Sequence, residues 1–152
     1  MFKHILVPTD GSKAALEAAE AVGRLASGAA DVHVTAVVVI APYDIENTDY
    51  DPAIVEQRNA MIRRHAEEAL KTTASTLAER GVACSIKILE GDPVSAILAR
   101  ETRLGGYDLI AMSSRGLSKQ KDSLHYLGGV TEHLIRRSQI PVLVIPVSDE
   151  ED

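Results

Sequence analysis

The chain has 152 residues, of which 45% are hydrophobic and 25% are charged, and its formal net charge is −6. This length suits one globular domain with a sizeable core, and the negative charge argues against a general nucleic-acid-binding protein. The core must be aliphatic, because the chain has no Trp and only one Phe.

The only cysteine, Cys84, excludes an intramolecular disulfide and fits a reducing compartment. It lies in the apolar run VACSIKIL, which predicts a buried, unreactive thiol. The apolar run near the N-terminus is too short for a signal peptide, and no segment approaches the ~18 apolar residues of a membrane span. We therefore expect a cytoplasmic protein.

In the first half of the chain, apolar β-branched runs alternate with helical patterns. Ile5 to Val7 predicts a buried strand ending at Pro8, and Ser12 predicts the N-cap of a helix. The apolar face of that helix is expected to carry Ala15, Leu16, Ala19, Val22 and Leu25. The nearly continuous β-branched run from Val32 to Ile40 predicts a strand buried on both faces.

A polar, acidic stretch from Pro42 to Pro52 predicts a loop that could close over a ligand. A long helix is predicted over Ala53 to Arg80, with Gly81 as its C-terminal stop, followed by a third strand over Val82 to Leu89.

The second half continues the alternation. Asp92 is predicted as an N-cap with Pro93 at the first helical position, and Val94, Ile97 and Leu98 are expected to face inward. The remaining predicted elements are a strand over Leu109 to Met112, a helix over Gly129 to Ser138 and a strand over Val142 to Ile145. Strands that alternate with helices predict one doubly wound parallel sheet of five strands.

Such a sheet binds ligands beyond the carboxyl ends of its strands, where the strand order reverses. Two loops would flank that crevice: one carries Pro8, Thr9, Asp10, Gly11 and Ser12, and the other runs from Ser113 to Gly129. Glycines at both ends of the second loop allow the backbone to approach a phosphate closely, and the start of the following helix offers free N–H groups. These features predict a nucleotide-binding site, although glycines of ordinary turns would give the same pattern.

The segments HILVPTDGS, GDP and GGVTEHLIRRSQIPVLVIP together resemble the universal stress protein family over nearly the whole chain. The resemblance implies a domain over 1–147 with an acidic tail over 148–152. The implied fold is a three-layer sandwich, flavodoxin-like or adenine-nucleotide α-hydrolase-like, with strand order 3-2-1-4-5. It also implies a small cytoplasmic stress-response regulator that binds ATP, ADP or AMP with little or no hydrolysis.

Carried onto this chain, the resemblance gives a set of nucleotide-binding candidates: Pro8, Thr9, Asp10, Val39, Ser113, Arg115, Gly116, Gly128, Gly129, Val130 and Thr131. Val39 would offer backbone groups to the adenine edge, and Asp10 would contact the ribose or hold Mg²⁺ through the nucleotide. Thr131 would add a hydroxyl near the phosphates. The resemblance also implies a homodimer formed through the last strand, Pro141 to Val147.

The glycine loop departs from the ATP-binding members in three respects. Ser113 stands in place of the first glycine, eleven residues rather than nine separate Gly116 from Gly128, and Gly129 stands in place of Ser or Thr. These departures leave an alternative interpretation: a family member that binds no nucleotide and acts only as a dimeric interaction protein.

Two other classes of protein find little support in the sequence. A slow ATPase or nucleotidyl transferase would need a general base, for which the sequence offers no convincing candidate. A receiver domain would need an aspartate at the end of the third strand, where this chain has Glu90. The five scattered histidines give no metal-ligand spacing.

Overall fold

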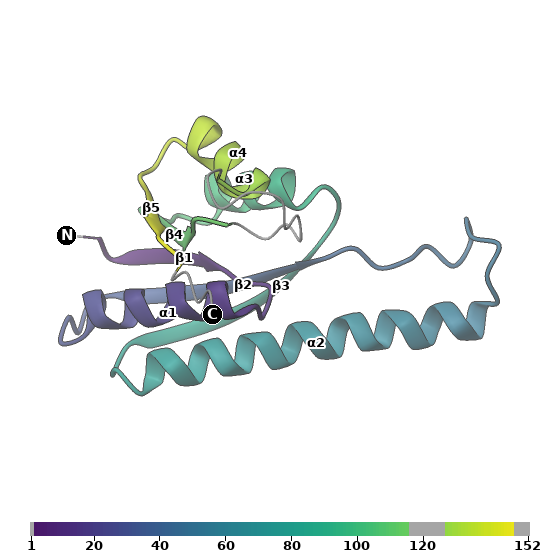
Figure 1. Ribbon diagram of the computed structural model, residues 1–152, viewed down its shortest axis with the longest axis horizontal. Helices are drawn as coiled ribbons and strands as arrows, with labels where there is room; N and C mark the ends of the chain where they lie inside the picture. Colours follow the sequence, from purple (N-terminus) through teal and green to yellow (C-terminus); the bar gives the residue numbers. More distant parts are fainter. Residues whose placement is uncertain (1, 116–126, 148–152) are drawn as a thin grey trace, which may run out of the picture.

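The computed structural model describes residues 2–115 and 127–147. Its five parallel strands form one sheet in the order β3-β2-β1-β4-β5, as predicted. The strands are β1 (His4–Pro8), β2 (His33–Ile40), β3 (Ala83–Glu90), β4 (Leu109–Ser113) and β5 (Val142–Ile145). The helices are α1 (Lys13–Ala26), α2 (Pro52–Ala78), α3 (Val94–Leu104) and α4 (Gly129–Arg137). Figure 1 shows α1 and α2 on one face of the sheet, with α3 and α4 on the other.

Both faces of the central strands are apolar, because neighbouring residues point to opposite layers. In β1, Ile5 and Val7 pack on the side of α1, whereas Leu6 packs against Leu98 of α3 and Leu134 of α4. This confirms that the short β-branched runs are strands covered on two sides. In the part of the chain that the structure describes, no helix is long and apolar enough to cross a membrane.

Three local predictions can be compared directly with the structure. Ser12 caps α1 as expected, since its Oγ accepts the Ala15 N–H at 3.2 Å. Leu25 was wrongly assigned to the buried face: it is 66% exposed, and Ala26 is buried in its place. The reason is that α1 packs on the sheet through small residues, so its apolar stripe is narrower than the leucine pattern suggested.

The start of α3 was also predicted one residue too early. Pro93 takes the N-cap position with an extended backbone, at φ −77° and ψ 156°, and no side chain caps the helix. Asp92 therefore lies outside α3 and does not act as its cap. Of the three residues expected to face inward, Leu98 is fully buried, and Val94 and Ile97 are half-buried.

The Cys84 thiol is half-buried on β3, and burial raises its pKa. A thiol with a raised pKa stays protonated and is a poor nucleophile at neutral pH. The structure therefore agrees with the prediction of an unreactive cysteine.

Helix α2 and the loop before it project well beyond the sheet (Figure 1). A helix of 27 residues is about 40 Å long, far longer than the strands it covers. Asp51 caps this helix, and Asn59 exchanges two hydrogen bonds with the backbone of Tyr43, at 2.8 and 3.0 Å. This loop, which the sequence suggests as a segment that could close over a ligand, lies along α2 (Figure 1).

Candidate functional site

The carboxyl edge of the sheet opens between β1 and β4. These strands pair only at Ile5 with Leu109 and at Leu6 with Ile110, although β1 continues to Pro8 and β4 to Ser113. On its other side, β1 stays paired with β2 as far as Pro8 and Val37. The two connections leaving this point run to opposite sides of the sheet, so the opening is the switch point where such folds bind ligands.

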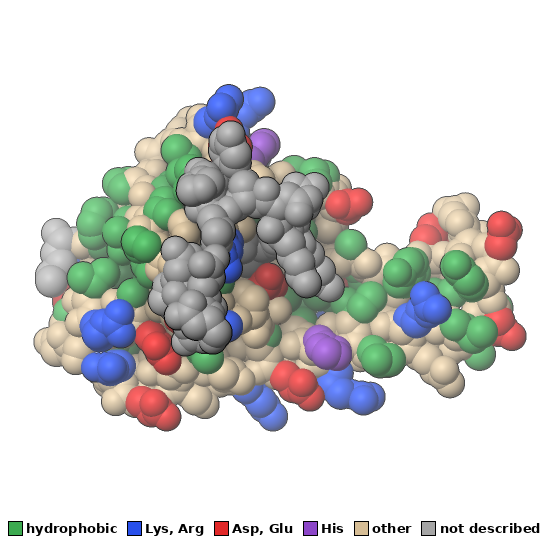
Figure 2. Space-filling view, in the orientation of Figure 1, with side chains coloured by type: hydrophobic (Ala, Val, Ile, Leu, Met, Phe, Trp, Pro, Cys, Tyr) green, Lys and Arg blue, Asp and Glu red, His purple; other side chains and the backbone are tan. Residues whose placement is uncertain are grey.

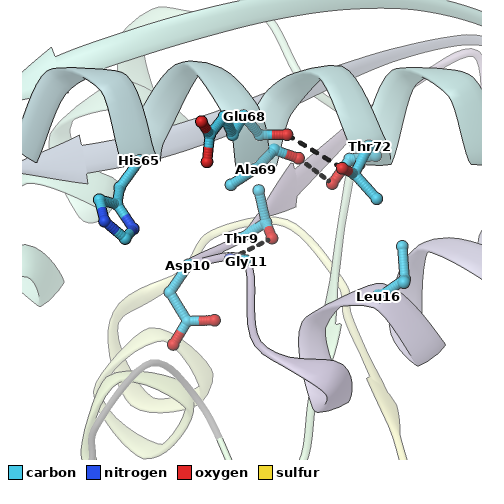
Figure 3. A pocket seen from close by; sticks show the side chains of 9 residues that line it. Thr9, Asp10, Gly11, Leu16, His65, Glu68, Ala69 and Thr72 are labelled. Carbon is cyan, nitrogen blue, oxygen red and sulfur yellow. Dashed lines mark hydrogen bonds between the residues drawn. The ribbon is translucent and has the colours of Figure 1, made fainter.

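The first predicted loop is a rigid turn at this edge. Thr9 is 1% exposed, and its Oγ1 accepts the Gly11 N–H at 3.1 Å, while Asp10 Oδ1 accepts the Ser12 N–H at 2.9 Å. Gly11 has φ +79°, and a Cβ there would lie 3.0 Å from the Cβ of Ala69, so this position requires glycine. The turn is thus fixed against α2, and Figure 3 shows the Asp10 carboxylate pointing away from that helix.

The backbone N–H and C=O of Val39 face the space beyond the end of β1. The Val37 C=O accepts the Thr9 N–H at 2.8 Å, whereas the Ile40 C=O accepts the Gly91 N–H at 2.9 Å. Because backbone groups alternate along a strand, the N–H and C=O of Val39 point to the β1 side, as those of Val37 do. No described residue hydrogen-bonds either group, since the pairing of β1 with β2 ends at Pro8 and Val37, two residues before Val39.

The second loop leaves and returns at the same edge. Ser113 is 3% exposed at the end of β4, and the Gly128 N–H donates to the Ser114 C=O at 3.0 Å, which holds the two ends of the loop together. Arg115 is exposed beside them, and Gly116 lies outside the described residues. The loop therefore delivers the chain to the start of α4 next to the end of β4.

The first backbone N–H groups of α4 are accessible to a ligand. Gly128 is the N-cap, and the first N–H bonded within the helix is that of Glu132, which donates to the Gly128 C=O at 2.9 Å. The N–H groups of Gly129, Val130 and Thr131 therefore have no partner within the helix. A Cβ built on Gly129 would meet no atom within 4 Å, so the space beside it is open.

The Thr131 hydroxyl does not have the role that the sequence suggested. Thr131 is 0% exposed, and its Oγ1 donates to the Ser113 C=O at 3.0 Å. The side chain points inward because it is on the buried face of α4, next to Leu134. It anchors α4 to β4, and only the backbone N–H of Thr131 remains a candidate for contact with a phosphate.

A hollow of about 680 Å³ lies between the end of β2 and α2, bordered by Asp10 and Val39. A smaller one, about 250 Å³, lies between the first turn and α2 and is drawn in Figure 3. The structure thus brings Thr9, Asp10 and Val39 together on the α2 side of the opening. Ser113, Arg115 and Gly128 to Thr131 line neither hollow among the described residues, and they approach the opening from β4 and α4.

Sequence reasoning missed the contribution of α2 to these hollows. The residues that it supplies include Arg58, Met61, Ile62, His65 and Ala66. Their spacing of three and four marks one helical face. That spacing is visible in the sequence, but nothing in the sequence says that this face lies beside the carboxyl edge of β2.

A metal site built by the protein alone finds no support in the described ranges 2–115 and 127–147, where no three His, Cys, Asp or Glu residues come together. The Asp10 carboxylate is exposed, and one of its oxygens is engaged by the Ser12 N–H. One carboxylate suits an ion such as Mg²⁺ that is held mainly by phosphates and water.

The sheet order and the helices on both faces define a doubly wound α/β protein. The profile of the universal stress protein family matches residues 1–146. A curated relative, universal stress protein MJ0531 of Methanocaldococcus jannaschii, is 30% identical over 152 residues, which are 99% of this chain and 86% of the relative. The chain belongs to the universal stress protein family.

Several solved structures share the fold, among them two with a nucleotide bound. A universal stress protein in complex with cAMP matches with a TM-score of 0.71 at 22% identity, over 97% of this chain and 99% of that chain. A universal stress protein family protein of Arabidopsis thaliana with AMP bound matches with a TM-score of 0.70 at 17% identity, over 97% and 94%.

The anchoring role of Thr131 can be tested by removing its hydroxyl. We expect Thr131→Val, which keeps the shape of the side chain, to lower the free energy of unfolding by about 1–3 kcal/mol, because it leaves the buried Ser113 C=O without a donor. Urea denaturation measures this change.

The matched control is Thr76→Val on α2, whose Oγ1 makes a similar bond to the Thr72 C=O at 2.9 Å in an exposed setting. This control should change stability by less than about 0.5 kcal/mol. Equal effects at the two positions would contradict the anchoring role.

Proposed function

We propose that this chain binds an adenine nucleotide, ATP, ADP or AMP, at the opening between β1 and β4. In this proposal it serves as a small cytoplasmic regulator in a stress response, with little or no hydrolysis. The observation that carries the proposal is that the N–H and C=O of Val39 face the space beyond the end of β1, where no described residue hydrogen-bonds them. The cAMP and AMP bound to two proteins of the same fold support the choice of adenine.

The base would lie in the hollow beside Val39. A peptide N–H next to its own C=O matches the edge of adenine, which carries an amino donor beside a ring-nitrogen acceptor. Tyr43, Met61 and Ile62 supply apolar and aromatic surface for the faces of the ring. A volume of about 680 Å³ lies within the range of small-molecule sites.

The phosphates would lie on the opposite side, at the start of α4. Three N–H groups without helical partners, those of Gly129, Val130 and Thr131, would donate to phosphate oxygens. Gly129 lacks the hydroxyl of its counterparts in ATP-binding members, but it leaves the backbone accessible. Arg115 and Gly116 would contribute from the loop, and Asp10 would contact the ribose or a phosphate-bound Mg²⁺.

Substitution of Gly129 tests this arrangement. Since a Cβ at this position meets open space, Gly129→Ser should fold as the parent does and should tighten ATP–Mg²⁺ binding by roughly two- to tenfold through one added hydrogen bond. Gly129→Val should fold as well, yet weaken binding at least about tenfold, because its branched side chain blocks approach to the helix start. Isothermal titration calorimetry measures both affinities.

Each variant is the control for the other, because both add a side chain at the same open position and they differ in whether it can donate a hydrogen bond. Equal affinity in the parent, Gly129→Ser and Gly129→Val would place the nucleotide elsewhere. Neither heat nor thermal stabilisation with millimolar ATP–Mg²⁺ would instead favour the alternative, a protein that acts through contacts with other proteins.

We also propose that the chain forms a homodimer through Pro141 to Val147. β5 is an edge strand whose four residues are half-buried, and β4 is its only neighbour in the described sheet. An apolar edge of this kind invites pairing with another chain, and a two-fold dimer would cover it symmetrically.

A charge on this edge should separate the subunits. We expect Val144→Lys to shift the protein from dimer to monomer in sedimentation velocity, whereas Ile86→Lys on β3, the opposite edge strand, should leave the dimer intact. A parent protein that is monomeric at high micromolar concentration would refute the proposed dimer, as would a Val144→Lys variant that still associates.

A further inference from the structure

A second hollow, of about 460 Å³, lies between α3 and α4 on the face opposite α2. It is near the amino edge of the sheet, since the turn before β4 and the turn before β5 contribute to it through Gly106, Tyr107 and Ile140. The nucleotide site proposed above is at the carboxyl edge. The two hollows are therefore separate, and their lining residues do not overlap.

The walls of this hollow are cationic. α3 supplies Arg100 and Arg103, which are three residues apart, and α4 supplies His133 and Arg137, which are four apart. Residues at these spacings share one helical face, so each helix presents its row of cations to the same space. Between the rows, apolar side chains such as Ala99 and Leu134 line the hollow. Figure 2 shows Lys and Arg side chains gathered at the top of the molecule, over α4.

The carboxylates of these helices are engaged elsewhere. Glu101 accepts from Lys87 Nζ at 2.5 Å and from the Tyr107 hydroxyl at 3.0 Å, and Glu132 pairs with Arg136 at 2.9 Å. Burial, together with Glu101, raises the Tyr107 pKa to about 12, so this phenol remains a donor at working pH. Neither carboxylate is thus available to neutralise the hollow.

Asp108, in the turn before β4, is also engaged, because it accepts the backbone N–H groups of Lys3 and His4 at 2.8 and 3.1 Å. Within the described chain, Arg100, Arg103 and Arg137 form no ion pair.

The ends of the two helices do not offset this charge. α3 ends at Leu104 and α4 at Arg137, both beside the hollow, and each C-terminus carries roughly half a negative charge. Together they amount to about one negative charge against three arginines, so a positive excess of about two remains before His133 is considered.

This excess is local, because the whole chain carries a formal charge of −6. A long polyanion such as nucleic acid would extend past the hollow into the repulsive field of the rest of the surface. A compact anion would not, because charges beyond about 8–10 Å are largely screened at physiological salt. The size, charge and apolar lining all favour a small organic molecule.

We propose that the hollow between α3 and α4 binds a compact organic polyanion, with two or more phosphate or carboxylate groups on a small apolar body. The anionic groups contact Arg100, Arg103 and Arg137, and the body lies against Ala99 and Leu134. Binding here is independent of the occupant of the carboxyl edge, so this site adds a second ligand to the one proposed above.

The test uses two probes that separate the phosphate and carboxylate chemistries: inorganic pyrophosphate and citrate. Isothermal titration at low salt should detect at least one of them, with an affinity that falls as salt is added. The double variant Arg100→Gln with Arg137→Gln should weaken that binding at least about tenfold, because two charged hydrogen bonds are lost. Arg103→Gln alone should weaken it as well.

Arg64→Gln is the matched control, since Arg64 is an exposed arginine of α2 that lines none of these hollows. It should leave the affinity unchanged, and so should Gly129→Val, which alters only the proposed nucleotide site. Which of the two probes binds shows whether the ligand of this hollow carries phosphate or carboxylate groups. Failure of both probes at millimolar concentration would overturn the proposal, as would equal binding by the parent and the double arginine variant; neither result bears on the nucleotide site.

Discussion

The early parting of β1 and β4 is the constraint on which the proposed function depends. The two strands pair over only two residues, so their carboxyl ends diverge. β1 also ends at Pro8, before β2 does, so Val39 of β2 has an N–H and a C=O that face the space beyond β1, and α4 begins beside the end of β4. A polar backbone group that a ligand covers needs a partner, and the edge of a base placed beside Val39 would supply one.

The surrounding contacts hold this gap in a fixed shape. Thr9 and Asp10 each accept a backbone N–H of the first turn, Ser12 accepts the Ala15 N–H of α1, and Gly11 packs on Ala69 of α2. On the other side, the buried bond from Thr131 to the Ser113 C=O fixes the start of α4 to the end of β4. The described residues on both sides of the proposed site are therefore organised without a ligand, which lowers the ordering entropy that binding would cost.

The sequence predicted all nine elements, because buried parallel strands are short apolar runs and the turns between them carry strong signals such as Ser12 and Gly81. The resemblance to the family implied the sheet order. Its errors concern side-chain direction. Leu25 and the Thr131 hydroxyl were given the wrong environment, since both depend on how a helix is rotated against the sheet. The contributions of Arg58 and His65 could not be foreseen for the same reason. Similarly, the cationic rows of α3 and α4 meet only through tertiary packing, and the net negative charge of the chain conceals them.

The central claim is that one ligand joins the Val39 backbone to the start of α4. The most direct measurement is a titration of ¹⁵N-labelled protein with AMP, followed through its backbone amide resonances. The account predicts that the amides of Val39 and of Gly129 to Thr131 shift together with a single dissociation constant, while Arg100 and Arg137 remain unchanged. Shifts confined to one side of the opening, or a response that spares Val39, would contradict it.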